Sequence, residues 1–237
     1  MRRILLAGAF AVVAAAPIIA LADTAERSPD IVVIDPGHGG KNSGAVVRGN
    51  VEKEIVLNIS EDLAQRLRRS KTLMPYLTRW DDSFVALSDR VLRGEAVNGK
   101  VFVSIHADNV RRVRNRGVVV FVYGLNKTIP DGPRREPGEK ILPPPTRAAR
   151  LSSTRLAERI RLSLKKHGIK TAPYVDKGRF AVLKSRKMPS VLIEVGNLRD
   201  RKEARLIGTA RFKRRFSKAV EEGVSVFLRQ ESRRARK

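Results

Sequence analysis

Two of the three histidines follow short apolar segments that are typical of buried strands. His38 comes after residues 31–34 (IVVI), within the segment DPGHGG, and His106 comes directly after residues 101–105 (VFVSI). In open α/β sheets, ligands bind outside the carboxyl ends of the strands. If the two strands are neighbours, both imidazoles therefore project into one crevice. Imidazole is a common ligand of divalent metals, so the pattern predicts a metal site.

A carboxylate is the predicted third ligand. The chain has no cysteine, which excludes disulfides, thiolate zinc sites and cysteine nucleophiles. Zinc in a hydrolytic site keeps one position for water beside its protein ligands. Glu52 and Glu54 stand at the start of a predicted helix, and Glu194 ends a predicted strand. Two histidines and one of these glutamates would bind the ion, and a second glutamate would act as the base.

Each of these residues also has a simpler interpretation. His38 would be a solvated turn residue, His106 a hydrogen-bonded residue at a strand end, and Glu194 one half of a salt bridge with a nearby arginine. A single metal ion would explain all three at once, which favours the metal site. His167 lies just before Gly168 at the end of a predicted helix, where it would interact with the helix dipole, and we leave it out of the site.

Alternating strands and helices are predicted to position these residues. Apolar patterns predict strands at residues 31–34, 73–78, 101–105, 117–123, 180–183 and 191–194. They predict helices at residues 53–69, 84–97, about 156–167 and about 212–227. This alternation indicates an α/β domain.

Two segments interrupt or end this pattern. Six prolines within residues 124–150 predict an irregular insert, which we interpret as a long surface loop, with a lid over the site as the alternative. Residues 229–237 are mostly basic and are expected to form a frayed tail.

The first 22 residues are typical of an export signal. A positive start is followed by an apolar run from Ile4 and by small residues that end at Ala22. We expect cleavage after Ala22, with a retained membrane anchor as the alternative, and a short linker over residues 23–30. The two arginines at positions 2 and 3 fit the general secretory or the twin-arginine route. The protein is expected to be exported and to be periplasmic or associated with the cell envelope.

The chain carries a large excess of positive charge. It has 49 Lys and Arg against 24 Asp and Glu, for a formal net charge of +25 in 237 residues. This excess predicts anionic partners and allows peripheral association with anionic envelope surfaces. The export signal and an aromatic content of only 5% argue against nucleic acid as that partner.

Six segments together resemble a known family. They are IVVIDPGHGG (31–40), GNVEK (49–53), LTR (77–79), FVALSDRV (84–91), FVSIHA (102–107) and VLIEVG (191–196). In this order and spacing the sequence is similar to the zinc-dependent N-acetylmuramoyl-L-alanine amidases of the type-3 family, the cell-wall amidases. The resemblance covers about residues 31 to 228, which we therefore expect to be one catalytic domain. It implies a mixed, largely parallel sheet flanked by helices on both faces.

The resemblance implies roles for particular residues. His38, Glu52 and His106 match the family's ligands of a single zinc ion, and Glu194 matches its catalytic glutamate. Glu54 falls two positions beyond the matched glutamate and is the weaker candidate. The sequence departs from the family pattern after His106, with Asp108, and after Glu194, with the segment VGNLR at 195–199.

The activity implied is zinc-dependent hydrolysis of the amide bond between N-acetylmuramic acid and L-alanine in peptidoglycan, in cell-wall remodelling or daughter-cell separation. The partners implied are peptidoglycan and a periplasmic activator protein, and we expect a monomer. By position, Arg79 and Arg90 would bind stem-peptide carboxylates, with salt bridges as the alternative. Glu136 and Glu139 of the insert would reach the metal in a closed state. The alternative functions are another zinc amidohydrolase or deacetylase and a catalytically silent envelope-binding module.

Overall fold

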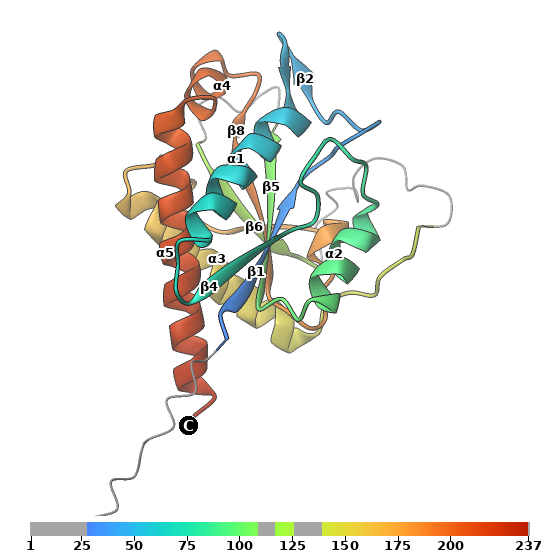
Figure 1. Ribbon diagram of the computed structural model, residues 1–237, viewed down its shortest axis with the longest axis vertical. Coiled ribbons are helices and arrows are strands. Elements are labelled where there is room, and N and C mark those ends of the chain that lie inside the picture. The colour runs from blue at the N-terminus through green and yellow to red at the C-terminus, as the bar shows by residue number, and fades with distance from the viewer. Residues whose placement is uncertain (1–27, 109–116, 126–138, 237) are drawn as a thin grey trace, which may run out of the picture.

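A six-stranded sheet forms the centre of the computed structural model, which describes residues 28–108, 117–125 and 139–236 (Figure 1). The strand order is β4-β1-β5-β8-β6-β7. Every neighbouring pair is parallel except β6 and β8, which are antiparallel. The prediction of a mixed, largely parallel sheet is therefore confirmed. The strands are β1 (Asp30–Pro36), β4 (Leu73–Leu77), β5 (Val101–Asp108), β6 (Val119–Tyr123), β7 (Asp176–Gly178) and β8 (Ser190–Asn197).

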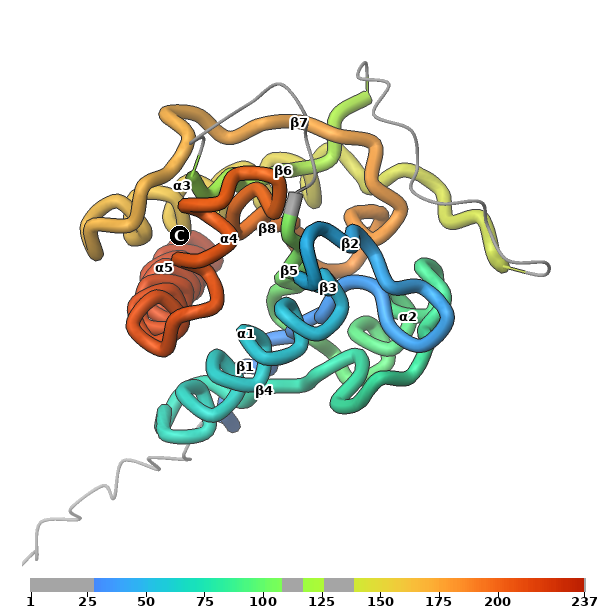
Figure 2. The backbone as a smooth tube through the Cα atoms, turned by 90° about the horizontal axis from the view of Figure 1, so that it is seen from above, coloured from blue at the N-terminus to red at the C-terminus, as the bar shows by residue number. Residues whose placement is uncertain are grey.

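Helices cover both faces of this sheet, as predicted (Figure 2). One face is covered by α1 (Glu52–Leu67), α3 (Arg147–Lys166) and α5 (Ala210–Arg234), and the other by α2 (Leu87–Ala96) and the 3-10 turn η1 (Ala181–Leu183). A short helix, α4 (Arg201–Ile207), follows β8 and precedes α5.

The side-chain alternation of the central strands explains these two layers. Ile34 and Val103 are fully buried under α1, α3 and α5, whereas Val33 and Phe102 are buried under α2 and η1. A strand that is covered on both faces is apolar at nearly every position, because its side chains point alternately to either face. This is why residues 31–34 and 101–103 are continuous apolar runs.

A small antiparallel hairpin sits at the carboxyl edge of the sheet. It consists of β2 (Val46–Val47) and β3 (Asn50–Val51), and α1 begins at the next residue, Glu52. The hairpin thus places Glu52, the first residue of α1, beside the segment that follows β1.

The predicted strand at residues 180–183 is wrong. Residues 181–183 form the turn η1, and the strand in this region is β7, a few residues earlier, which pairs in parallel with β6. Val182 and Leu183 are buried against α2 and the sheet, so they contribute to the core without pairing. A short apolar run does not by itself distinguish a strand from a buried turn.

Two predicted boundaries also differ. The insert predicted at 124–150 ends earlier, because α3 begins at Arg147, and the Thr146 hydroxyl caps the helix by accepting a 3.1 Å hydrogen bond from Ala149 N. Helix α5 continues to Arg234, through most of the tail that was expected to fray. Glu231 anchors this last part, since it accepts hydrogen bonds from Arg155 of α3 at 3.0 and 2.6 Å. Residues 1–27, with the predicted export signal, lie outside the described part of the chain.

Candidate metal centre

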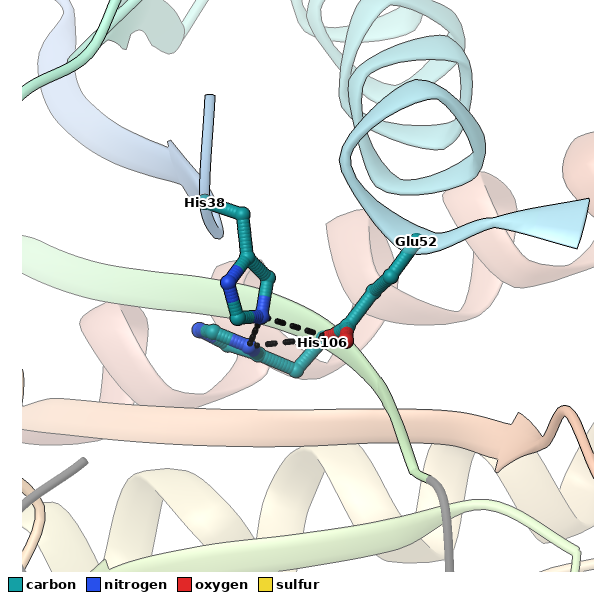
Figure 3. Close-up of side chains that lie close together, drawn as sticks. All are labelled: His38, Glu52 and His106. Atoms are coloured by element: carbon teal, nitrogen blue, oxygen red, sulfur yellow. Dashed lines mark hydrogen bonds and ion pairs between the residues drawn. The ribbon is translucent and has the colours of Figure 1, made fainter. Parts of the chain in front are cut away.

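Three predicted ligands converge at the carboxyl edge of the sheet (Figure 3). Strands β1 and β5 pair in parallel, so they end at the same edge. His38 lies two residues beyond β1, His106 lies near the end of β5, and Glu52 is the first residue of α1. The prediction that the strands of the two histidines are neighbours is therefore confirmed.

The ligand atoms of these side chains lie within 4.8 Å of one another. His38 Nε2 is 2.9 Å and His106 Nδ1 is 3.2 Å from Glu52 Oε1, and the two ring nitrogens are 3.2 Å apart. We call His38, Glu52 and His106 the ligand cluster. Two imidazole nitrogens and one carboxylate oxygen are a donor set suited to a divalent metal such as zinc.

Glu52 is held in place by the backbone on both sides. Its carboxylate accepts hydrogen bonds from Ala107 N at 3.0 Å and from Ala45 N at 2.8 Å, and the residue is only 5% exposed. Burial would raise the pKa of Glu52, but hydrogen bonds with His106 and His38 outweigh this and hold the pKa below its usual range. The carboxylate is therefore ionised, as a metal ligand must be. The alternative, Glu54, is exposed on α1.

The loop after β1 is shaped around the ligand cluster. His38 Nδ1 and Gly44 N lie 2.9 and 3.0 Å from Asn42 Oδ1, so this amide oxygen accepts both and directs His38 Nε2 toward the cluster. Gly44 has a φ of +65°, and a Cβ there would lie 2.6 Å from Glu52 Oε2 and 2.7 Å from His38 Cδ2. Only glycine allows the chain to pass so close to two ligands.

Glu194 lies beside the ligand cluster on the neighbouring strand. It is in direct register with His106 in the parallel pair of β5 and β8, and it is partly buried. Residues in register on adjacent strands point to the same face of a sheet. The predicted base is thus next to a predicted ligand, although the two residues are far apart in the sequence.

Arg79 is buried and connects the two segments that carry His38 and Glu52. It is 1% exposed, and its Nη2 donates to Gly37 O at 2.7 Å and to Lys53 O at 2.9 Å. These carbonyls belong to the residues directly before His38 and directly after Glu52.

Arg90 of α2 holds the same loop from the other side. It is 2% exposed, and its guanidinium donates to Pro36 O at 2.7 Å, to His38 O at 2.6 Å and to Asp35 Oδ1 at 2.9 Å. These contacts favour a positioning role for Arg79 and Arg90 over the substrate-binding role that the sequence suggested, because both guanidinium groups are directed into the protein.

Sequence reasoning missed Asp35, the fully buried carboxylate behind the site. It accepts hydrogen bonds from Thr78 Oγ1 at 2.6 Å, Ser104 Oγ at 2.7 Å and Arg90 Nη1 at 2.9 Å. A signal was available, since a carboxylate in an apolar strand is costly to bury unless it has partners. Asn42 was also missed, and its sequence context carries no comparable signal.

The insert residues do not join the ligand cluster in the described chain. Glu139 Oε1 accepts a 3.1 Å hydrogen bond from Ser88 N in the first turn of α2. Glu136 lies outside the described residues. His167, which we left out of the site, forms a 2.8 Å ion pair with Glu222.

A family model described as N-acetylmuramoyl-L-alanine amidase matches residues 32–226 of this chain. Among curated relatives, N-acetylmuramoyl-L-alanine amidase AmiA of Escherichia coli is 32% identical over 220 residues, which cover 82% of this chain and 74% of the relative. Several other curated amidases are longer, and the chain spans about half (52–53%) of their length.

Solved structures of amidases share the fold. The catalytic domain of CwlV from Bacillus (Paenibacillus) polymyxa var. colistinus is 29% identical, with a TM-score of 0.68 and coverage of 84% of this chain and 98% of that one. The CwlD amidase of Clostridioides difficile, solved in complex with the GerS lipoprotein, is 25% identical, with a TM-score of 0.65 and coverage of 84% and 98%.

Proposed function

The chain belongs to the N-acetylmuramoyl-L-alanine amidase family, and on this premise we propose that it hydrolyses the amide bond between N-acetylmuramic acid and L-alanine in peptidoglycan. The observation that carries the proposal is the register of Glu194 with His106, which puts a carboxylate beside three converging ligands. This arrangement suits hydrolysis better than binding alone, because binding has no need of a base next to a metal.

We propose that His38, Glu52 and His106 hold one zinc ion per chain. The donor set fits zinc, and the ligand atoms come from three separate segments, namely the loop after β1, the first turn of α1 and strand β5. Asn42 keeps the tautomer of His38 in which Nε2 is the ligand atom. When bound, zinc lowers the pKa of a water molecule toward about 7 and stabilises negative charge on the substrate carbonyl oxygen.

The proposed role of Glu194 is general base and then general acid. Its carboxylate accepts a proton from the water whose oxygen attacks the lactyl carbonyl carbon. It then delivers that proton to the alanine nitrogen as the C–N bond breaks, which leaves a carboxylic acid on the glycan and a free amino group on the stem peptide. The new carboxylic acid then loses its proton to that amino group or to solvent, and the product is a carboxylate at neutral pH. Arg79 and Arg90 contribute by keeping the main chain around His38 and Glu52 in place.

The proposed setting is the cell envelope. We propose that residues 1–22 are an export signal and that the protein works in the periplasm or at the envelope, in wall remodelling or daughter-cell separation. No helix in the described part of the chain is long and apolar enough to cross a membrane. The complex of CwlD with a lipoprotein supports an activator protein as a partner.

The products of digestion test this proposal. Purified protein is incubated with intact peptidoglycan, and both soluble and glycan products are analysed. We expect free stem peptides that begin with L-alanine and glycan strands without peptides, with activity lost to a chelator and restored by zinc. Release of acetate without peptides would instead indicate a deacetylase. Binding of peptidoglycan without any cleavage, with zinc present, would indicate an envelope-binding module.

A further inference from the structure

The positive charge of the chain is concentrated on three helices. Helices α3, α4 and α5 carry 18 Lys and Arg against 5 Glu, which gives 13 of the net +25 charges. Helix α1, on the same side of the sheet, carries two basic and four acidic residues. The excess is therefore a local feature of one surface, which we call the basic layer and define as α3, α4 and α5.

The basic layer is continuous, because α3 packs along α5 and α4 adjoins the start of α5 (Figures 1 and 2). On α5, the buried stripe of Phe212, Phe216 and Val220 faces the core. Exposed cations follow the opposite stripe, at Arg211, Arg214, Lys218, Arg229 and Arg233. Within each group these cations are three or four residues apart, which puts them on the same outer side of the helix. Residues 219–228 between the two groups contain no Lys or Arg, and Arg229 follows Lys218 after eleven residues, or about three turns.

The acidic groups of the basic layer are engaged within the fold. Glu231 pairs with Arg155 at 2.6 Å, Glu222 with Lys166 at 2.5 Å and Glu158 with Arg161 at 2.9 Å. Glu221 pairs with Arg66 of α1, and Glu203 accepts hydrogen bonds from Gly117 N and Asn197 N. Since each glutamate neutralises at most one cation, the large excess of positive charge remains on the outer surface.

Large apolar side chains are exposed among these cations. Leu151 and Leu162 of α3 are 53% and 45% exposed, and Leu206 of α4 is 53% exposed. The two α3 leucines are eleven residues apart, about three turns, so they lie on one stripe with Arg147, Arg155 and Lys166. A helix surface that combines cations with leucines suits the interface of an anionic bilayer, where the charges meet head groups and the leucines enter the acyl boundary.

We propose that the basic layer is a peripheral membrane-binding surface that docks on bilayers rich in anionic phospholipid. A hydrophilic wall polymer would satisfy the cations but would leave the three leucines in water, which is why the observations favour a lipid surface. The ligand cluster lies at the carboxyl edge of the sheet and takes no part in this contact. The inference does not depend on the amidase reaction, so either proposal can fail without the other.

Co-sedimentation with lipid vesicles tests the proposal. The full chain is used for every variant, so that any effect of residues 1–27 is the same for all of them. It is mixed either with anionic vesicles of phosphatidylglycerol and phosphatidylethanolamine or with neutral vesicles of phosphatidylcholine alone. We expect binding to the anionic vesicles that exceeds binding to the neutral ones and weakens with salt. The variant Arg211→Gln/Arg214→Gln/Lys218→Gln should lose about fivefold per charge, or roughly a hundredfold in all.

A matched control removes the same number of charges from the other side of the protein. Lys100, Arg186 and Lys187 are exposed near α2 and η1, and their replacement by Gln should have a much smaller effect. Equal losses in both triple variants would overturn the proposal, because they would show a diffuse effect of net charge. The far-ultraviolet circular dichroism spectrum and the urea unfolding midpoint should be unchanged in both, which verifies that the variants are folded whether or not the chain hydrolyses peptidoglycan.

The leucines distinguish a bilayer from a polymer. The variant Leu151→Ser/Leu162→Ser should bind anionic vesicles less tightly at high salt, where the apolar contacts carry more of the binding, while its binding to purified peptidoglycan is unaffected. If the wild-type chain bound purified peptidoglycan through the basic layer and ignored anionic vesicles, the partner would be the wall polymer and the proposal would be wrong.

Discussion

Arg90 donates a 2.6 Å hydrogen bond from Nη2 to the carbonyl oxygen of His38, so a buried guanidinium of α2 holds the main chain of a proposed metal ligand. The same side chain reaches Pro36 O and the Asp35 carboxylate. The position of His38 therefore depends on a contact between residues 52 positions apart, and α2 becomes part of the site although it carries no ligand.

Replacing Arg90 with lysine tests this support. A lysine ammonium lacks the planar fork that satisfies three acceptors at once, so the loop of His38 should lose its fixed position. We expect Arg90→Lys to weaken zinc binding by about 10–100-fold, the usual effect of removing a group that orients a ligand. Competition with a chromogenic chelator measures the affinity. Unaltered zinc affinity in a folded variant would show that α2 does not position His38.

Asn42 also positions His38, and its replacement is expected to disturb the loop less than the replacement of Arg90. Its Oδ1 lies 2.9 Å from His38 Nδ1, so Asn42→Ala removes the group that fixes the tautomer and ring orientation of His38. We expect a roughly tenfold loss of zinc affinity with little change in the free energy of unfolding of the metal-free chain. Asn58, which is exposed on α1 and donates a hydrogen bond to the Glu54 carbonyl of its own helix, provides the control Asn58→Ala.

Asp35 should contribute stability in a pH-dependent way. Burial raises its pKa, but the Arg90 charge and two hydroxyl donors outweigh this and hold the pKa below its usual range. Because the pKa is lower in the folded state, the stabilisation is complete above about pH 4 and is lost as the pH falls through the folded pKa.

Urea unfolding of the metal-free chain measures this effect. At pH 7, Asp35→Asn should lower the free energy of unfolding by about 3–5 kcal/mol, since it leaves the Arg90 charge buried without its partner. The difference between wild type and variant should shrink as the pH is lowered below 4. A difference that stayed constant with pH would contradict the assignment of the effect to the Asp35 charge.

Glu194→Gln separates catalysis from metal binding. The variant keeps the shape of the side chain but cannot accept a proton, so turnover on peptidoglycan should fall by about 10²–10⁴-fold. Zinc content measured by atomic absorption should remain near one per chain, because Glu194 is not in the ligand cluster. Near-normal activity in a zinc-loaded variant would remove Glu194 from the mechanism.

His106→Ala should have the opposite pattern. It removes one of three ligands, so we expect zinc to be lost on dialysis and activity to disappear with it. His167→Ala is the matched control, because His167 pairs with Glu222 away from the cluster and its loss should leave zinc content unchanged. Full zinc occupancy of His106→Ala would mean that the ion is held elsewhere.

The sequence alone indicated the α/β layering and the regions of most of the main strands, because strands buried on both faces leave continuous apolar runs. It also indicated that His38 and His106 belong to one site, since the carboxyl ends of neighbouring parallel strands lie at the same edge of a sheet. The choice between Glu52 and Glu54 came from the family resemblance and not from spacing. In the structure, Glu52 lies beside the two histidines, whereas Glu54 is exposed on α1.

Only the tertiary structure decided what surrounds those side chains. Four hydrogen bonds near the site link residues that are more than 40 positions apart in the sequence. They connect Arg79 with Gly37, Arg90 with Asp35, Thr78 with Asp35, and Glu139 with Ser88 at the start of α2. The turn at residues 181–183 likewise took the place of a predicted strand because α2 and the sheet bury it. Local patterns report which residues are apolar, whereas hydrogen bonds between distant segments depend on how the chain folds back on itself.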